Sequence, residues 1–206
     1  MKYVLYLLGT ICAACVSCGP ISPSRVEIPN RYVWAYELTM DHQGFSFLKD
    51  SLYSGYTIEK DRNGNLKKKS PYLNGKMEGT MIGYYPSGDT LYTRPYHLGE
   101  KHGIHRGYYP NGTLQFRYIF ENGFSQGHHQ EWYADGSQKM DLHYLDGKER
   151  GLQRVWRPDG KMKSNYVVRE NGRKYGFLGL KRCSKIDSET QNIEPYTGVL
   201  TTETRP

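Results

Sequence analysis

Glycine recurs every 24 residues through the middle of the chain, and this spacing constrains the fold more than any other feature of the sequence. The first series is spaced 24, 24, 24, 24 and 25 residues: Gly55, Gly79, Gly103, Gly127, Gly151 and Gly176. A second series is spaced 24 residues throughout: Gly64, Gly88, Gly112, Gly136 and Gly160. A third is spaced 24, 24, 24 and 25 residues: Gly75, Gly99, Gly123, Gly147 and Gly172. A fixed period of this length indicates a repeat protein in which each unit is one small supersecondary element.

Each unit contains two turn signals, and the segments between the turns are too short for anything but strands. The turns are marked by Asn-Gly and Asp-Gly pairs such as Asn63-Gly64 and Asn122-Gly123. Both residue types tolerate the positive φ that two-residue hairpin turns require. Residues 114–121 alternate apolar and polar side chains with the period of a strand. The sequence therefore predicts an all-β fold, an elongated single-layer antiparallel sheet of tandem β-hairpins.

Two neighbouring rows of aromatic residues follow the first glycine of the units. The row five residues after that glycine is expected to stack along the sheet as its core, and it consists of Tyr84, Tyr108, Trp132 and Trp156. Adjacent strand residues point to opposite sides, so the second row is expected to be exposed. We predict that this second row, Tyr85, Tyr109 and Tyr133, binds a partner. Regularly spaced rings of either row are also suited to stacking on the sugars of a glycan.

The first 17 residues have the features of a lipoprotein signal peptide. Lys2 precedes an apolar run that is too short to span a bilayer. The stretch Cys15-Val-Ser-Cys18-Gly resembles the lipobox of bacterial lipoproteins, which implies that Cys18 is acylated, with Cys15 as the alternative site. This assignment predicts a protein of the bacterial cell envelope, lipid-anchored to a membrane on its periplasmic or cell-surface side. Only Cys183 would then remain as a thiol, so no disulfide framework is expected.

The remaining sequence divides around the repeats. Residues 18–30 contain three prolines and are predicted to be a tether. Apolar residues in repeat register, Tyr36 and Leu48, indicate a degenerate N-terminal capping repeat over 31–54. Five repeats of about 24 residues cover 55–176, a closing strand is expected within 177–186, and the polar stretch 187–206 is predicted to be a mobile tail.

The unit from Gly103 to Gly127, with its run Gly-Tyr-Tyr-Pro-Asn-Gly, resembles the MORN family of repeats in its bacterial variant. The resemblance covers about residues 55–176 and implies a repeat fold with an interaction or scaffold function. Bacterial proteins with these repeats are often labelled as antitoxin components. The first and last units depart from the pattern, with Asp61 and Arg157 in place of the second aromatic residue.

Six of the seven histidines lie between His97 and His143, which raises the hypothesis of a metal site. His105 and His129 are one repeat apart, which corresponds to two strands or about 9.5 Å, too far for one ion. We therefore expect solvated strand histidines and no metal or other cofactor, although convergence of His102, His105 and His128 stays open. The sequence contains no catalytic motif, and an open sheet has no water-excluded cleft that would shift a pKa. No enzyme activity is expected.

Together these observations predict a non-catalytic envelope lipoprotein that binds an envelope protein through a repetitive tyrosine-rich β face. One alternative is an antitoxin or immunity protein against an envelope-acting toxin. Another is binding of cell-wall glycan or anionic lipid, which the net charge of +7 and the run from Lys67 to Lys69 favour. Nucleic acid is not an expected partner outside the cytoplasm, and the free ends of the sheet permit an end-to-end homodimer.

Overall fold

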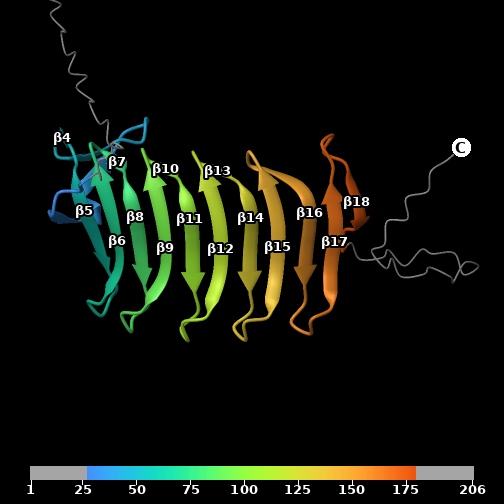
Figure 1. Cartoon of the computed structure of the whole chain (residues 1–206). Helices are drawn as coiled ribbons and strands as arrows, with labels where there is room; N and C mark the ends of the chain where they lie inside the picture. Colours follow the sequence, from blue (N-terminus) through green and yellow to red (C-terminus); the bar gives the residue numbers. More distant parts are fainter. Residues whose placement is uncertain (1–26, 180–206) are drawn as a thin grey trace, which may run out of the picture.

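The computed structural model describes residues 27–179, and the strands of its large sheet lie side by side in one long layer (Figure 1). The predicted all-β architecture of tandem hairpins is confirmed. The helical content of the described residues is one turn of 3-10 helix, η1 (Ala35–Glu37). Within this part of the chain, no helix has the length and apolar character needed to cross a membrane.

The strands of the first repeat show the pattern that later units copy. β5 (Gly55–Lys60) and the longer β6 (Leu66–Leu73) form a hairpin, and β7 (Lys76–Met77) folds back on the end of β6. The following strands are β8 (Gly79–Tyr84), β9 (Thr90–His97), β10 (Glu100–Lys101), β11 (Gly103–Tyr108), β12 (Leu114–Glu121), β13 (Phe124–Ser125), β14 (Gly127–Trp132), β15 (Gln138–Leu145), β16 (Lys148–Trp156), β17 (Met162–Val168) and β18 (Lys174–Phe177).

The large sheet has the strand order β1-β5-β6-β8-β9-β11-β12-β14-β15-β16-β17-β18, with β7, β10 and β13 paired off this path. From β5 to β18 neighbouring strands are antiparallel. The first glycine of every unit lies opposite the same position of the next strand, as in the pairs Gly55 with Tyr72 and Gly103 with Phe120. Because the register repeats, side chains at equivalent positions form rows that run across the strands.

The two turns of each unit are of different kinds. The turn between Asn74 and Gly75 has positive φ at both residues, as the sequence predicts for a two-residue hairpin. At the opposite end of the strands, Asp61 N–H donates to Asn65 O across three loop residues, and only Gly64 has positive φ. These longer loops are accompanied by a shift in strand register, so the expectation of tight two-residue turns is wrong at this end.

Backbone hydrogen bonds also join one unit to the next. The turn glycine of each of four hairpins donates its N–H to a carbonyl 22 residues earlier. These bonds are Gly75 to Tyr53, Gly99 to Met77, Gly123 to Lys101 and Gly147 to Ser125. Each hairpin tip is therefore bonded to a residue two positions before the first glycine of its own unit. These bonds keep the units at a constant spacing.

The segment before the repeats is folded, although it does not add another hairpin to the large sheet. β1 (Tyr32–Trp34) pairs in parallel with β5, whereas β2 (Leu38–Met40), β3 (Ser46–Leu48) and β4 (Ser51–Leu52) form a separate three-stranded sheet. Tyr36, expected at an apolar position, is 81% exposed. Beyond the repeats, β18 ends where the closing strand was expected to begin, and residues 180–206 lie outside the described part.

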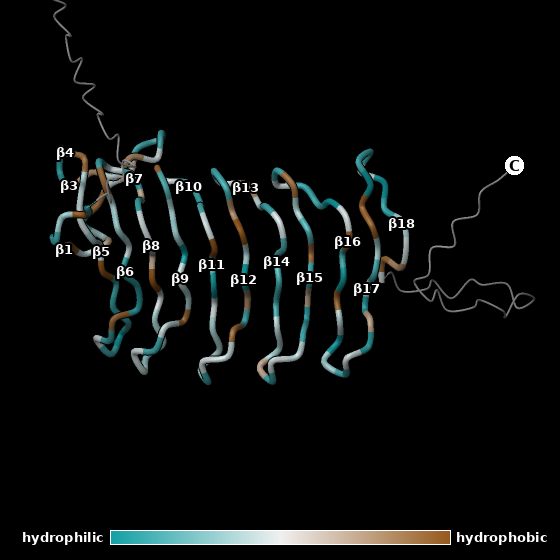
Figure 2. The backbone as a smooth tube through the Cα atoms, in the orientation of Figure 1, coloured by the Kyte–Doolittle hydropathy of each residue, from teal (hydrophilic) through white to brown (hydrophobic). Residues whose placement is uncertain are grey.

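The core is thin because the sheet has no second layer. Figure 2 shows apolar residues distributed along the length of the sheet rather than gathered in one part of the molecule. Among the described residues, the buried apolar side chains are Tyr53, Pro71, Met81 and Val168. Buried polar side chains are more numerous: Ser46, Thr57, Ser70, His105, His129, Asp141, Gln153 and Ser164. Hydrogen bonds of these buried polar side chains therefore contribute much of the stabilisation that apolar packing provides in a globular domain.

Candidate binding surface

The tyrosines predicted to bind a partner link neighbouring units. Each hydroxyl donates to the backbone carbonyl of the residue 23 positions later. The bonds are Tyr85 to Tyr108 at 2.7 Å, Tyr109 to Trp132 at 2.9 Å and Tyr133 to Trp156 at 2.9 Å. All three side chains are half-buried rather than exposed. The hydroxyls therefore have a structural partner inside the chain.

The first aromatic row does not form the buried core that the sequence predicts. Tyr84, Tyr108, Trp132 and Trp156 are all half-buried. They follow the position where the register shifts at the long loops, so the simple alternation of sides ends before they are reached. The buried row lies three residues earlier in each unit, at the second residue after the glycine.

This buried row consists of Thr57, Met81, His105, His129 and Gln153. The histidines are 3% and 6% exposed, so the expectation that they are solvated is wrong. Nε2 of His105 lies 2.8 Å from Pro95 O, and Nε2 of His129 lies 2.8 Å from Ile119 O. A carbonyl can only accept, so each Nε2 carries a proton. The histidines are therefore structural donors that satisfy a carbonyl of the preceding unit.

Aromatic rings enclose the buried histidines from both neighbouring strands. His105 lies between Tyr96 and Phe120, at centroid distances of 5.7 and 4.7 Å, and His129 contacts Phe120 and Tyr144 at 5.2 and 4.6 Å. Burial lowers the pKa of both imidazoles below 6.5, and the carbonyl bonds oppose this shift only partly. We call the side of the sheet that carries His105 and His129 the histidine face.

Two glycines on the histidine face make room for rings. A Cβ on Gly107 would meet the ring of Phe116, and a Cβ on Gly83 would meet the ring of Tyr92. Glu131 occupies the equivalent place in the next unit, where its partner across the strands is Met140. On this face, the rings of Phe116 and Tyr92 therefore lie over the backbone of a glycine on the neighbouring strand.

Glu131, on the histidine face, is bound by a tyrosine and a lysine. Its carboxylate accepts the hydroxyl of Tyr118 and lies 2.8 Å from Lys139 Nζ. Burial, together with the hydrogen bond to Glu131, raises the pKa of the Tyr118 hydroxyl far above 10.0, and the same carboxylate raises the pKa of Lys139. The charge of Glu131 is thus held by two donors within the sheet.

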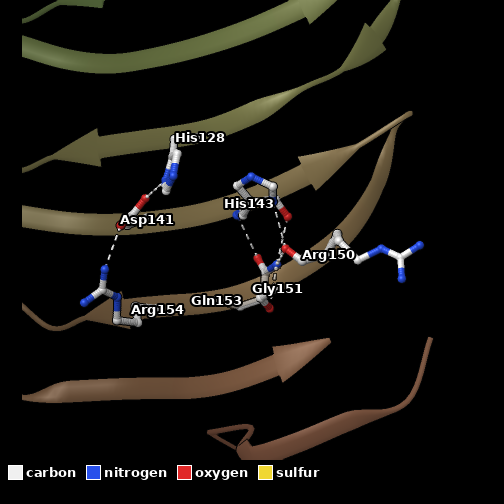
Figure 3. Close-up of polar contacts among 7 residues, drawn as sticks. All are labelled: His128, Asp141, His143, Arg150, Gly151, Gln153 and Arg154. Carbon is white, nitrogen blue, oxygen red and sulfur yellow. Dashed lines mark hydrogen bonds and ion pairs between the residues drawn. The ribbon is translucent and has the colours of Figure 1, made fainter. Parts of the chain in front are cut away.

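The opposite side, which we call the arginine face, carries Arg106 and Arg117 directly opposite each other on β11 and β12. Like charges in this position destabilise a strand pair. In the part of the chain that the structure describes, neither guanidinium has a hydrogen bond or an ion pair. Asp141, two strands away from Arg117, is engaged by His128 and Arg154 at 2.9 and 3.0 Å (Figure 3). The pair of arginines therefore forms a cationic patch that the fold does not need.

One unit of the chain matches a known repeat family. The family model of the MORN repeat variant matches residues 101–122, which include β11, the long loop and all of β12. The chain therefore contains a MORN-type repeat. No curated protein matches the chain. The matched unit contains the hairpin and glycines that recur in the other units, and a MORN repeat suggests a repeat-based binding scaffold.

Some predicted site residues lie outside the described part of the chain. These are Cys18 and its alternative Cys15, and the remaining thiol, Cys183, also lies outside that part. Within residues 27–179, no group of three or more His, Cys, Asp and Glu side chains is arranged to hold a metal ion. The convergence of His102, His105 and His128 that the sequence left open is not formed.

Proposed function

We propose that this MORN-type protein is a non-catalytic binding scaffold of the bacterial cell envelope, tethered through lipid on Cys18, that binds an envelope protein through the outer surface of its repeats. The observation that carries the proposal is the open sheet, in which five units repeat one register. Such a surface offers equivalent contacts at regular intervals along an extended partner.

The two faces of the sheet differ in how many of their central side chains the fold requires. On the histidine face the central side chains are buried donors and rings packed over glycine. On the arginine face the central row includes Arg106, Arg117 and Gln130, which are half-exposed and change from unit to unit. The arginine face therefore has more freedom to carry specificity, and its positive charge favours an acidic protein surface.

The tyrosine row contributes its ring edges at the loop end of the strands. A matched pair of variants separates this role from the internal hydrogen bond. Tyr109→Phe loses the bond to Trp132 O but keeps the ring, whereas Tyr109→Ala loses both. If the ring contacts the partner, capture of the partner falls more in Tyr109→Ala than in Tyr109→Phe. Equal capture by both variants contradicts the assigned contact, provided that both retain the β-sheet signal in circular dichroism.

A photocrosslinking residue placed on one face at a time tests which surface is used. Gln130 represents the arginine face, and Arg94, which lies over the ring of Tyr92 on the other side, represents the histidine face. Crosslinking in intact cells is expected to attach an envelope protein at position 130 and not at 94. A neighbouring-gene toxin attached there would favour the immunity role, and attached glycan would favour cell-wall binding. Absence of any adduct at either position contradicts the scaffold.

The anchor is tested separately by fractionation. Cys18→Ala should move the protein from the membrane fraction to the soluble fraction, while Cys15→Ala should leave it at the membrane. The reverse outcome assigns the lipid to Cys15. Retention of both single variants and of the double variant at the membrane contradicts a lipid anchor on either cysteine.

A further inference from the structure

Two histidines lie directly opposite each other on β14 and β15. His128 and His143 are register partners on the arginine face, with ring centroids 5.0 Å apart and ring planes at 80° (Figure 3). The side chain of His128 is 56% exposed, so solvent reaches the pair.

Each of the two rings is oriented by a hydrogen bond at its own Nδ1. Nδ1 of His128 lies 2.9 Å from the Asp141 carboxylate, and Nδ1 of His143 lies 3.0 Å from Arg150 O. A carboxylate and a carbonyl accept, so in the neutral rings both protons are on Nδ1. Each Nε2 then keeps its lone pair, and within residues 27–179 neither Nε2 has a hydrogen-bond partner. An imidazole whose Nδ1–H donates to a carboxylate or a backbone carbonyl is the usual arrangement of a metal ligand.

The groups behind the rings are themselves fixed. Asp141 is 7% exposed, and its second oxygen accepts from Arg154 at 3.0 Å. Gln153, fully buried, donates to the carbonyls of His143 and Arg150 at 2.8 and 3.0 Å and accepts from His143 N–H at 3.2 Å. These bonds hold the backbone that positions His143 and the carbonyl that orients its ring (Figure 3).

The repeat itself does not require histidine at this pair. The equivalent cross-strand partners in the other units are Tyr56 with Pro71, Thr80 with Pro95, Ile104 with Ile119, and Leu152 with Val167. Isoleucine and valine suit this strand position better than histidine does. The two histidines and Asp141 are therefore peculiar to the fourth unit, and the frame of the fold does not account for them.

We infer that His128 and His143 bind a transition-metal ion such as Zn²⁺ or Cu²⁺ through their Nε2 atoms. With metal–nitrogen bonds near ~2.0–2.1 Å, two imidazoles on one tetrahedral ion have centroids about 5.2 Å apart, and at a right angle about 4.5 Å. The 5.0 Å separation in the sheet lies between these values. Water, or a side chain of a bound partner, fills the remaining positions on the ion.

The other histidines of the region lack one of these properties. His105 and His129 are buried, and their Nε2 atoms donate to carbonyls, so they have no free lone pair there. His97 and His102 are 5.7 Å apart, and although Nδ1 of His97 contacts Glu78, Nδ1 of His102 has no partner to orient the ring. The pair His97 and His102 is therefore a suitable internal control.

The test uses the full chain without a histidine tag. Titration calorimetry with Zn²⁺ and electron paramagnetic resonance with Cu²⁺ at pH 7.5 should show one ion per chain and two bound imidazole nitrogens. The double variant His128→Ile with His143→Ile copies the pair Ile104 and Ile119 of the preceding unit, so it is expected to fold. It should lose at least tenfold in affinity, and Asp141→Asn should lose roughly 10–100-fold because the ring of His128 is no longer held by a carboxylate.

His97→Ile is the matched control and should bind Zn²⁺ as the unaltered protein does. The assignment is overturned if the double isoleucine variant keeps full affinity, or if His97→Ile abolishes binding. The same melting temperature for the metal-free unaltered protein and the metal-free double variant would show that the histidines serve the metal and not the sheet. The inference is independent of the lipid anchor and of the envelope partner.

Discussion

Replacing Gly107 by alanine should destabilise the sheet, because the ring of Phe116 lies where the new methyl group must go. The added Cβ would be 2.5 Å from Phe116 Cζ and closer still to Cε1, whereas ordinary contacts begin near 3.4 Å. The ring must therefore retreat by at least 0.9 Å along this direction (3.4 minus 2.5). It cannot do so freely, since it stacks on Tyr118 at a centroid distance of 4.7 Å and an interplanar angle of 18°.

The expected loss is about 1–2 kcal/mol. Inserting a methyl group into a packed site costs roughly 1–3 kcal/mol. Alanine in place of glycine inside a strand offsets roughly 0.5–1 kcal/mol of this, because the unfolded chain loses entropy. Gly107 does not have the positive φ of the turn glycines, so backbone strain adds nothing. For a domain of this size the loss corresponds to a melting temperature lower by about 2–8 °C.

The assay is urea denaturation followed by circular dichroism, with two companion variants. Gly107→Ala combined with Phe116→Met copies the fourth unit, where Met140 faces the residue at this position, and should recover stability by at least about 0.5 kcal/mol relative to additivity. Gly112→Ala meets no atom within 4 Å but has a φ of +80°, so Phe116→Met should not rescue it. If Gly107→Ala is as stable as the unaltered protein, or if the double variant is merely additive, the steric reasoning is refuted.

Three further outcomes follow from single side chains. Leu98 has a φ of +51° where Asn122 stands in the next unit, and it is 66% exposed, so Leu98→Asn should stabilise the protein by about 0.5–1 kcal/mol in the same denaturation assay. Because burial lowers the pKa of His129 below 6.5, the unfolded chain takes up a proton that the folded chain does not. Stability should therefore fall as the pH drops below about 6.5 towards the folded pKa, and His129→Gln, which copies Gln153, should make denaturation midpoints between pH 7.5 and 5 less dependent on pH. Tyr109→Phe should cost about 1 kcal/mol of unfolding free energy through loss of the bond to the next unit, and an unchanged midpoint would show that water replaces it.

The glycine spacing was enough to predict the class of fold, because glycines at fixed intervals mark places where the backbone must take positive φ. It was not enough to predict which side of a strand is buried. The long loops shift the register by one residue near Tyr108, and such a shift inverts the sides that alternation assigns. The burial of His105 was missed for a different reason. A lone histidine on a strand is ordinarily solvated, and only its row, shared with Met81 and Gln153, identifies the position as internal.

The same row explains why function is better sought on the arginine face. At the second residue after the glycine, Thr57, Met81 and His105 differ in chemistry yet are all buried. Side chains on the histidine face are therefore constrained by the neighbouring ring or carbonyl that they contact. Across the sheet, Arg106 and Arg117 place like charges opposite each other, and His128 and His143 occupy a pair of positions that the other units fill without histidine. Cross-strand pairs that the repeat does not require need another explanation. A bound anion or acidic partner for the arginines, and a metal ion for the histidines, are the ligands whose chemistry supplies that reason.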